Sequence, residues 1–297
     1  MRRRIALTAA AIIALASIPS ACATPRGPGG SPGGAPAPTE TLVHGSAEGG
    51  PPPFVVRYDQ TELQLAATSW CYGNGCADGM DENPPSIGSP SEVLVFVPVT
   101  SFDELSVSQT SGERWACDSR LLEAVVEDLG GGWWSIEPRG PADDYLIDLF
   151  ASGDGDMAAS FRWTTTEDRP LPEPTASLAL VVDHDGEPDS YGLELSVANL
   201  SATPEEYSAT ISTTASNARS LTFDAQPAEH CAGEGALYFD EPDAEAKAAA
   251  ELGDFPFEYR VVLELDGETY VAEATYPDDL IEEHGVAVDL EFTPALP

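Results

Sequence analysis

The sequence predicts an all-β protein with two antiparallel β-sandwich domains and one short helix in the second domain. From Pro53 onward, apolar and polar residues alternate in short runs that are separated by Gly, Pro, Asn or Asp. Short strands at this spacing are typical of sandwiches and barrels. One segment, residues 244–252, is instead rich in helix formers.

Residues 1–22 carry the pattern of an export signal. Three arginines, Arg2–Arg4, precede an almost wholly apolar run over residues 5–18, and Pro19 ends that run. A positive segment followed by a short apolar segment is typical of a secretory signal peptide. The run is shorter than the ~20 apolar residues that a transmembrane helix needs. We therefore expect the chain to leave the cytoplasm.

Two processing sites overlap after this run. Ala21-Cys22-Ala23 fits cleavage after Ala23, which would give a secreted protein. Ser20-Ala21-Cys22 instead resembles the end of a bacterial lipobox, although Pro19 stands where that motif has an apolar residue. We favour lipidation of Cys22, because cysteine is scarce and this one directly precedes a flexible segment. Several acyl chains would then hold the protein on the extracytoplasmic face of the cell membrane.

Residues 23–53 are predicted to be a disordered tether. Gly, Pro, Ser and Ala dominate this segment, so it lacks the apolar surface that would offset the entropy of ordering. Its reach is roughly 30 Å as a flexible coil and about 90 Å as polyproline II.

The charge of the chain limits its partners. The formal net charge is −38, which makes nucleic acid and anionic lipid poor partners. One interpretation is that the chain binds cations or a cation-rich partner. The other, which we favour, is that the acids are spread over solvated faces and keep the protein soluble.

Residues 54–168 are predicted to form the first sandwich. Residues 121–129 fit either a helical stripe or a strand, and we favour a strand or a short irregular segment. The other expected strands are residues 54–58, 63–70, 93–97, 133–137 and 157–164. Between the last two, Pro141–Leu149 resembles the P-A-G-x-Y-x-V-x-V signature of bacterial immunoglobulin-like domains, with Asp143 in place of the glycine. The resemblance implies that Tyr145 packs at a sheet corner and that its hydroxyl bonds back to the chain.

Residues 169–174 are predicted to be a linker, since three prolines at alternate positions make a stiff connector. The second sandwich is expected over 175–297. Asp266-Gly267 predicts a type I′ hairpin turn. Pro242 and Gly253 fit the start and end of the helix. The remaining expected strands are residues 177–182, 191–197 and 207–213.

Four cysteines follow Cys22, and an even number in an exported protein indicates two disulfides. Our first choice pairs Cys71 with Cys76 across a hairpin and Cys117 with Cys231 between the domains. The rival joins Cys71 or Cys76 to Cys117 inside the first domain. A structural role is favoured over a redox or metal role for the Cys71/Cys76 pair.

One acidic loop suggests a cation site. Asp183, Asp185, Glu187 and Asp189 surround Gly186, and calcium prefers six to eight oxygen ligands. The loop does not fit the EF-hand pattern, so a plain hairpin is favoured, with weak calcium binding through Asp183, Asp185 and Asp189 as the alternative. No other cofactor is indicated.

We find no catalytic motif in the sequence and therefore predict no catalytic residue. None of the four histidines lies in a hydrolase or zinc motif. Core packing is the favoured role of most of the five tryptophans. Trp133 and Trp134 are neighbours on one expected strand, so one of them must point outward, where it could contact a glycan or protein.

Taken together, the chain resembles uncharacterised secreted lipoproteins of actinobacterial type with tandem immunoglobulin-like domains. The Cys22 junction with its tether, Trp70–Gly79 and Asp183–Gly192 carry the resemblance. It implies an envelope location and a β-sandwich fold, and no activity. The leading hypothesis is a non-catalytic, membrane-anchored binding or structural module with an envelope protein or glycan as partner. A calcium-stabilised adhesion module and an envelope hydrolase are the alternatives.

Overall fold

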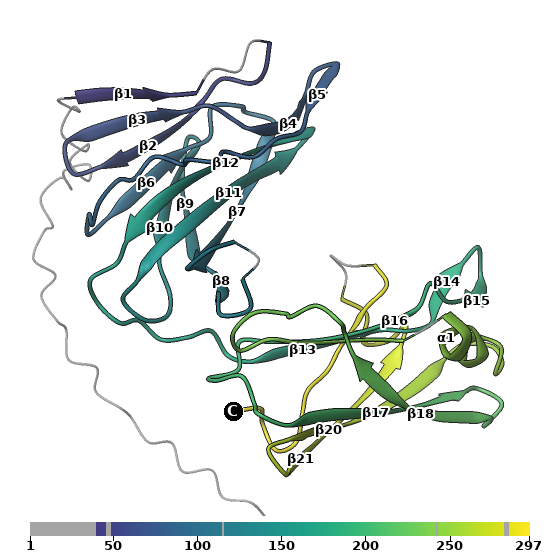
Figure 1. The fold of residues 1–297 in the computed structure, drawn as a ribbon. Coiled ribbons are helices and arrows are strands. Elements are labelled where there is room, and N and C mark those ends of the chain that lie inside the picture. Colours follow the sequence, from purple (N-terminus) through teal and green to yellow (C-terminus); the bar gives the residue numbers. More distant parts are fainter. Residues whose placement is uncertain (1–39, 46–48, 115, 242, 282–284) are drawn as a thin grey trace, which may run out of the picture. The chain divides into compact units, whose positions relative to one another are not determined.

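A computed structural model describes residues 40–45, 49–114, 116–241, 243–281 and 285–297 (Figure 1). Strands β1–β22 and one helix, α1, make up the regular structure of this part. Nearly all strand pairs are antiparallel, and the sheets pack in sandwich-like layers. The predicted fold class is therefore confirmed. Within the described residues, no helix has the length and apolar character to cross a membrane.

The first half of the described chain forms two six-stranded sheets. Sheet A has the strand order β1-β3-β2-β6-β10-β9, and sheet B has the order β5-β4-β12-β11-β7-β8. The strands of sheet A are β1 (Glu40–His44), β2 (Phe54–Tyr58), β3 (Thr61–Leu65), β6 (Val93–Phe96), β9 (Val125–Gly130) and β10 (Trp133–Glu137). Those of sheet B are β4 (Ser69–Tyr72), β5 (Gly75–Ala77), β7 (Phe102–Ser111), β8 (Leu121–Glu123), β11 (Asp144–Gly153) and β12 (Gly155–Thr164).

One apolar core lies between sheets A and B. Val56 and Val95 of sheet A and Val107, Ile147 and Phe161 of sheet B belong to a single cluster of buried side chains. Inward residues alternate with outward ones along strands such as β2 and β6, as expected from the two-residue period of a β-strand. The ambiguous segment 121–129 contributes β8 and β9, so it is strand, as favoured from the sequence.

The predicted tether is too long at its carboxyl end. Residues 40–44 form β1, which pairs in parallel with β3 from Glu40↔Thr61 to His44↔Leu65. The unpaired backbone groups at the edge of β3 supply this strand with hydrogen bonds, and Leu42 and Val43 suit a strand. The predicted strand 63–70 is likewise divided, because the chain passes from sheet A to sheet B between Leu65 and Ser69. Residues 1–39, with the predicted signal and the first part of the tether, lie outside the described residues, as do residues 46–48.

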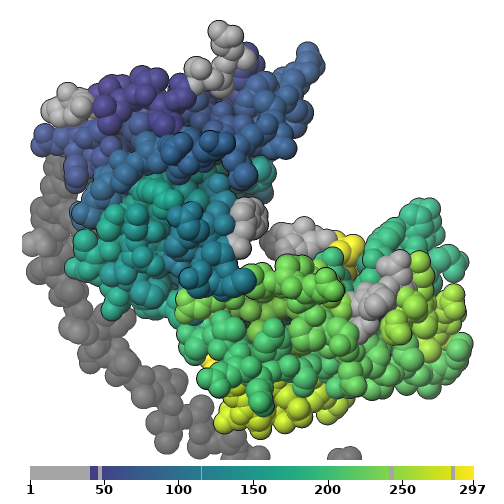
Figure 2. Space-filling view, viewed as in Figure 1, coloured from purple at the N-terminus to yellow at the C-terminus, as the bar shows by residue number. Residues whose placement is uncertain are grey.

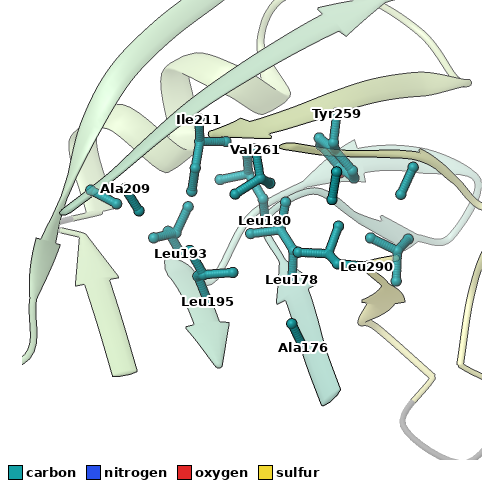
Figure 3. Packing of buried hydrophobic residues seen from close by; sticks show 14 of the residues in the cluster. Ala176, Leu178, Leu180, Leu193, Leu195, Ala209, Ile211, Tyr259, Val261 and Leu290 are labelled. Atoms are coloured by element: carbon teal, nitrogen blue, oxygen red, sulfur yellow. The ribbon is translucent and has the colours of Figure 1, made fainter. Parts of the chain in front are cut away.

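The second half forms an eight-stranded sheet with the order β21-β20-β17-β18-β19-β16-β13-β22, and a separate β14-β15 hairpin. The strands are β13 (Thr175–Ala179), β14 (Val182–His184), β15 (Glu187–Asp189), β16 (Leu193–Ala198), β17 (Tyr207–Ala215), β18 (Ser220–Pro227), β19 (Leu237–Glu241), β20 (Phe257–Leu265), β21 (Glu268–Tyr276) and β22 (Val288–Asp289). In its core, Leu178 of β13 and Leu195 of β16 face Ile211 of β17 and Val261 of β20 (Figure 3).

The predicted turn and helix of this half are present. Asp266 and Gly267 both have positive φ, at 49° and 83°, as a type I′ turn between β20 and β21 requires. Helix α1 (Asp243–Ala250) buries Ala246 and Ala249 against the core. Pro242 lies outside the described residues. The two core clusters fall on either side of the predicted linker at 169–174, and the division into two domains stays a prediction.

Candidate functional site

The outer face of sheet B carries a cavity of about 780 Å³. Two rows of paired residues cross this face. Ser106 of β7 and Ala158 of β12 both pair with Phe150 of β11, and Ser108 and Ser160 pair with Asp148 in the same way. All six residues line the cavity. Four of the six are serine or alanine, whose short side chains extend little above the backbone. They therefore leave open space over this face of the sheet.

Exposed apolar side chains border this space. Met80 is 67% exposed, Leu121 63% and Phe150 44%, and all three line the cavity. Large apolar groups that stay in water next to a cavity are typical of ligand-binding sites. We call the four small residues, Ser106, Ser108, Ala158 and Ser160, the floor of the cavity. The exposed apolar side chains lie beside this floor.

Arg114 lies across this floor. Its Nη2 donates hydrogen bonds to Asp148 Oδ1 and, at 3.2 Å, to Ser160 Oγ, while Nη1 is 3.5 Å from Met80 Sδ. The Ser160 hydroxyl also donates to Asp148 Oδ1, at 2.5 Å. The guanidinium and the carboxylate therefore neutralise each other, and the network fixes the position of the Arg114 side chain.

Residues from the second half of the chain complete the lining. Cys231, Ala232 and Gly233 line the cavity, and the Cys117–Cys231 disulfide joins this segment to the loop before β8, with Cα atoms 5.3 Å apart. The Glu234 N–H donates to the Ser119 carbonyl oxygen at 2.8 Å. Gly233 has a φ of 95°, and a Cβ there would lie 2.8 Å from the same oxygen, so this approach requires glycine.

Arg120 strengthens the same junction. Its side chain is 6% exposed. It donates to the carbonyl oxygens of Leu200 at 2.8 Å and Ser201 at 3.2 Å, and to Glu234 Oε1 at 3.1 Å. Sequence reasoning missed both Arg114 and Arg120. The one signal in the sequence was that basic residues are scarce: lysine and arginine together number 13, against 51 acidic residues.

The loop after β5 is tied to strand β1. His44 Nε2 lies 2.5 Å from Asp81 Oδ2, next to Met80 at the cavity border. Partial burial by itself raises the pKa of the Asp81 carboxyl, but the Asn83 N–H and the His44 ring lower it below its ordinary value.

The disulfides have the pairing placed first from the sequence. Cys71 and Cys76 are joined across the β4-β5 hairpin, with Cα atoms 4.1 Å apart. This hairpin projects from the surrounding surface (Figure 2). Gly73 in its turn has a positive φ of 62°. Cys117–Cys231 is the second bridge, and the rival pairing inside the first domain is absent.

The acidic loop forms the β14-β15 hairpin, with positive φ at Asp185 and Gly186. Asp183 Oδ1 accepts a hydrogen bond from the Gly186 N–H at 2.7 Å, and Asp189 Oδ1 accepts one from the Ser190 N–H at 2.8 Å. In the described part of the chain, no three His, Cys, Asp or Glu side chains form a group that could hold a metal ion. The calcium hypothesis for Asp183, Asp185 and Asp189 therefore finds no support in the geometry.

None of the described histidines is among the residues that line the cavity. His184 Nε2 is 3.8 Å from Asp185 Oδ2, and His184 Nδ1 is 3.4 Å from the Tyr191 hydroxyl. The ring of His230 packs against that of Tyr238 at a tilted angle, with ring centres 5.6 Å apart. His284 lies outside the described residues.

Core packing accounts for three of the tryptophans. Trp163 is buried and donates from Nε1 to the Pro90 carbonyl oxygen, and Trp70 and Trp134 pack against the core. Trp133 is the outward member of its pair. The Arg57 guanidinium lies 4.4 Å from its ring centre, and the ring of Phe96 is 5.1 Å away. Trp115 lies outside the described residues.

Comparison with known proteins gives no family for this chain. It matches no protein-family model and no curated protein sequence. The geometry of the cavity therefore carries the functional argument.

Proposed function

We propose that this protein is a non-catalytic, membrane-anchored envelope lipoprotein that binds a ligand with an apolar part in the cavity on sheet B. Its location rests on the sequence pattern of residues 1–22 and on the resemblance to actinobacterial-type lipoproteins. Its binding role rests on the cavity. The observation that carries the proposal is the floor of Ser106, Ser108, Ala158 and Ser160 beside exposed Met80, Leu121 and Phe150.

Covering these apolar groups would supply the binding energy. Burial of apolar surface contributes roughly 25 cal/mol per Å². Met80, Leu121 and Phe150 are each at least 44% exposed, so they have surface left to bury. A cavity of about 780 Å³ lies within the size range of small-molecule sites.

A binding role fits the polar groups of the cavity. The Arg114 guanidinium and the Asp148 carboxylate bind each other and Ser160. These hydrogen bonds hold the three side chains in place before a ligand binds. The Cys117–Cys231 disulfide and the Arg120 hydrogen bonds fix the wall at residues 231–233. A preformed site loses less conformational entropy on binding than a flexible one.

A dye titration tests the proposal. The full chain is purified with Cys22→Ala, so that no acyl group competes for the site, and is titrated with the neutral apolar dye N-phenyl-1-naphthylamine. Ser106→Trp places a large side chain on the cavity floor. Ser208→Trp is the matched control, because Ser208 is an exposed strand residue of β17 outside the cavity lining.

We expect saturable dye fluorescence with the parent chain and with Ser208→Trp, and at least a tenfold weaker affinity with Ser106→Trp, a loss of about 1.4 kcal/mol. Absence of saturable binding, or equal affinity in both tryptophan variants, would exclude the cavity as the binding site.

A further inference from the structure

The carboxylates of the cavity indicate the charge of its ligand. Asp78, Glu123 and Asp148 line it, whereas Arg114 is the one cationic side chain among the described lining residues. Arg114 is paired with Asp148. Asp78 and Glu123 are exposed, and no salt bridge within the described part of the chain includes either. The cavity therefore keeps an excess of negative charge beside its apolar surface.

We infer that the cavity takes a cationic amphiphile: a small molecule with an apolar body and a protonated amine or quaternary ammonium head. This inference rests on the proposed binding function and adds the charge of the ligand. The apolar body would lie over the floor between Phe150 and Met80. The head would lie near Asp78, next to β5 at one edge of sheet B, or near Glu123 of β8 at the other edge.

Two features separate this ligand from an anionic one. The Arg114 guanidinium is held by Asp148 and Ser160, so an anion would have to displace an existing ion pair. The surrounding chain, at a formal net charge of −38, repels anions and attracts cations over a longer range.

Calorimetric titration of three probes tests the inference. Decyltrimethylammonium, 1-decanol and decanoate share the decyl group or its equivalent and differ in head charge, and each is used below its micelle concentration. The protein is the full chain with Cys22→Ala. We expect the cation to bind about fivefold tighter than the alcohol, as one or two partly exposed charge pairs allow, and the anion to bind more weakly than both.

A charge-removing double variant locates the effect. Asp78→Asn with Glu123→Gln should bring decyltrimethylammonium to the affinity of 1-decanol and leave the alcohol unchanged. Asp278→Asn with Glu291→Gln is the matched control. It removes the same charge from exposed residues outside the cavity lining and should keep the preference. High salt should reduce the preference in the parent chain.

The other outcomes distinguish the two proposals. Equal binding of all three probes, or tighter binding of decanoate, would overturn the inferred charge and leave the cavity as a binding site. A cation preference that survives in the double variant would overturn the role of Asp78 and Glu123. If none of the three probes binds while the dye does, the inferred ligand class is wrong. If the dye also fails to bind, the proposed function is wrong as well.

Discussion

The Arg120 guanidinium donates a hydrogen bond to the Leu200 carbonyl oxygen at 2.8 Å, although 80 residues separate the two in sequence. The same guanidinium reaches Ser201 and Glu234. A buried arginine is stable only when its donors are satisfied. This contact therefore joins the strand β8 region to the second half of the chain, next to the Cys117–Cys231 disulfide and the cavity wall.

Replacing Arg120 should destabilise the protein strongly. Arg120→Met leaves the carbonyl oxygens of Leu200 and Ser201 without their donor, so we expect a loss of about 2–4 kcal/mol in the free energy of unfolding. Arg260→Met is the control, because that exposed side chain makes one ion pair, at 3.9 Å, with Glu273. It should cost less than about 1 kcal/mol. Equal losses in urea unfolding would contradict the structural role of Arg120.

Ionisation of Tyr145 should lower the stability of the protein at alkaline pH. The Tyr145 hydroxyl donates to the Pro141 carbonyl oxygen at 2.8 Å. Burial, followed by the nearby Asp143 carboxylate, raises the pKa of Tyr145 from 10.0 to about 12. Because the folded pKa is the higher one, this contribution to stability is complete below pH 10 and is lost as the pH rises from 10 to about 12.

Tyr145→Phe should therefore cost about 1 kcal/mol at neutral pH, through the lost hydrogen bond. Its disadvantage relative to the parent chain should shrink as the pH rises through that interval. Tyr191→Phe, at an exposed tyrosine, serves as the control and should follow the parent chain. Urea unfolding at a series of pH values measures the difference. A disadvantage that stays constant up to about pH 12 would show that ionisation of Tyr145 is not linked to folding.

Much of the fold follows from local sequence signals. Alternation along residues 145–149 and the Asp266-Gly267 turn specify strands and a hairpin within a few residues, and both are present. The tyrosine corner is local too, because Tyr145 and Pro141 are four residues apart. The strand at residues 40–44 was missed because its hydrogen bonds come from the distant strand β3, while Gly and Pro surround it in sequence.

The candidate site could not be found in the same way. Its floor exists because the small residues Ser106 and Ala158 pair with Phe150 from either side in the register of three strands. In the sequence, each of these residues occupies an ordinary outward position of a strand, and nothing indicates that it lines a cavity. The role of Arg114, in the turn after β7, depends in the same way on Asp148 of β11 and Ser160 of β12. The β11-β12 register belongs to one hairpin, but Ser106 is 44 residues from Phe150 in sequence, and local patterns do not indicate that β7 pairs with β11.

The anchor is tested at a single residue. Cys22→Ala should move the protein from the membrane fraction to the soluble fraction, because the acyl chains that hold it would be absent. Ser31→Ala, a small change in the predicted tether, should leave it in the membrane fraction. Immunoblots of fractionated cells measure both. If the Cys22→Ala chain stays in the membrane fraction, lipidation of Cys22 is not what anchors it.

The most direct test of the cavity is methyl NMR of the three methionines. The full chain with Cys22→Ala is labelled at its methionine methyl groups and titrated with N-phenyl-1-naphthylamine. Met80 borders the cavity and is 67% exposed, whereas Met157 is fully buried in the core between sheets A and B and serves as an internal control. We predict that the Met80 signal shifts until the dye saturates, while that of Met157 stays nearly unchanged. A Met80 signal that does not move while the dye binds would place the binding site elsewhere and contradict the account.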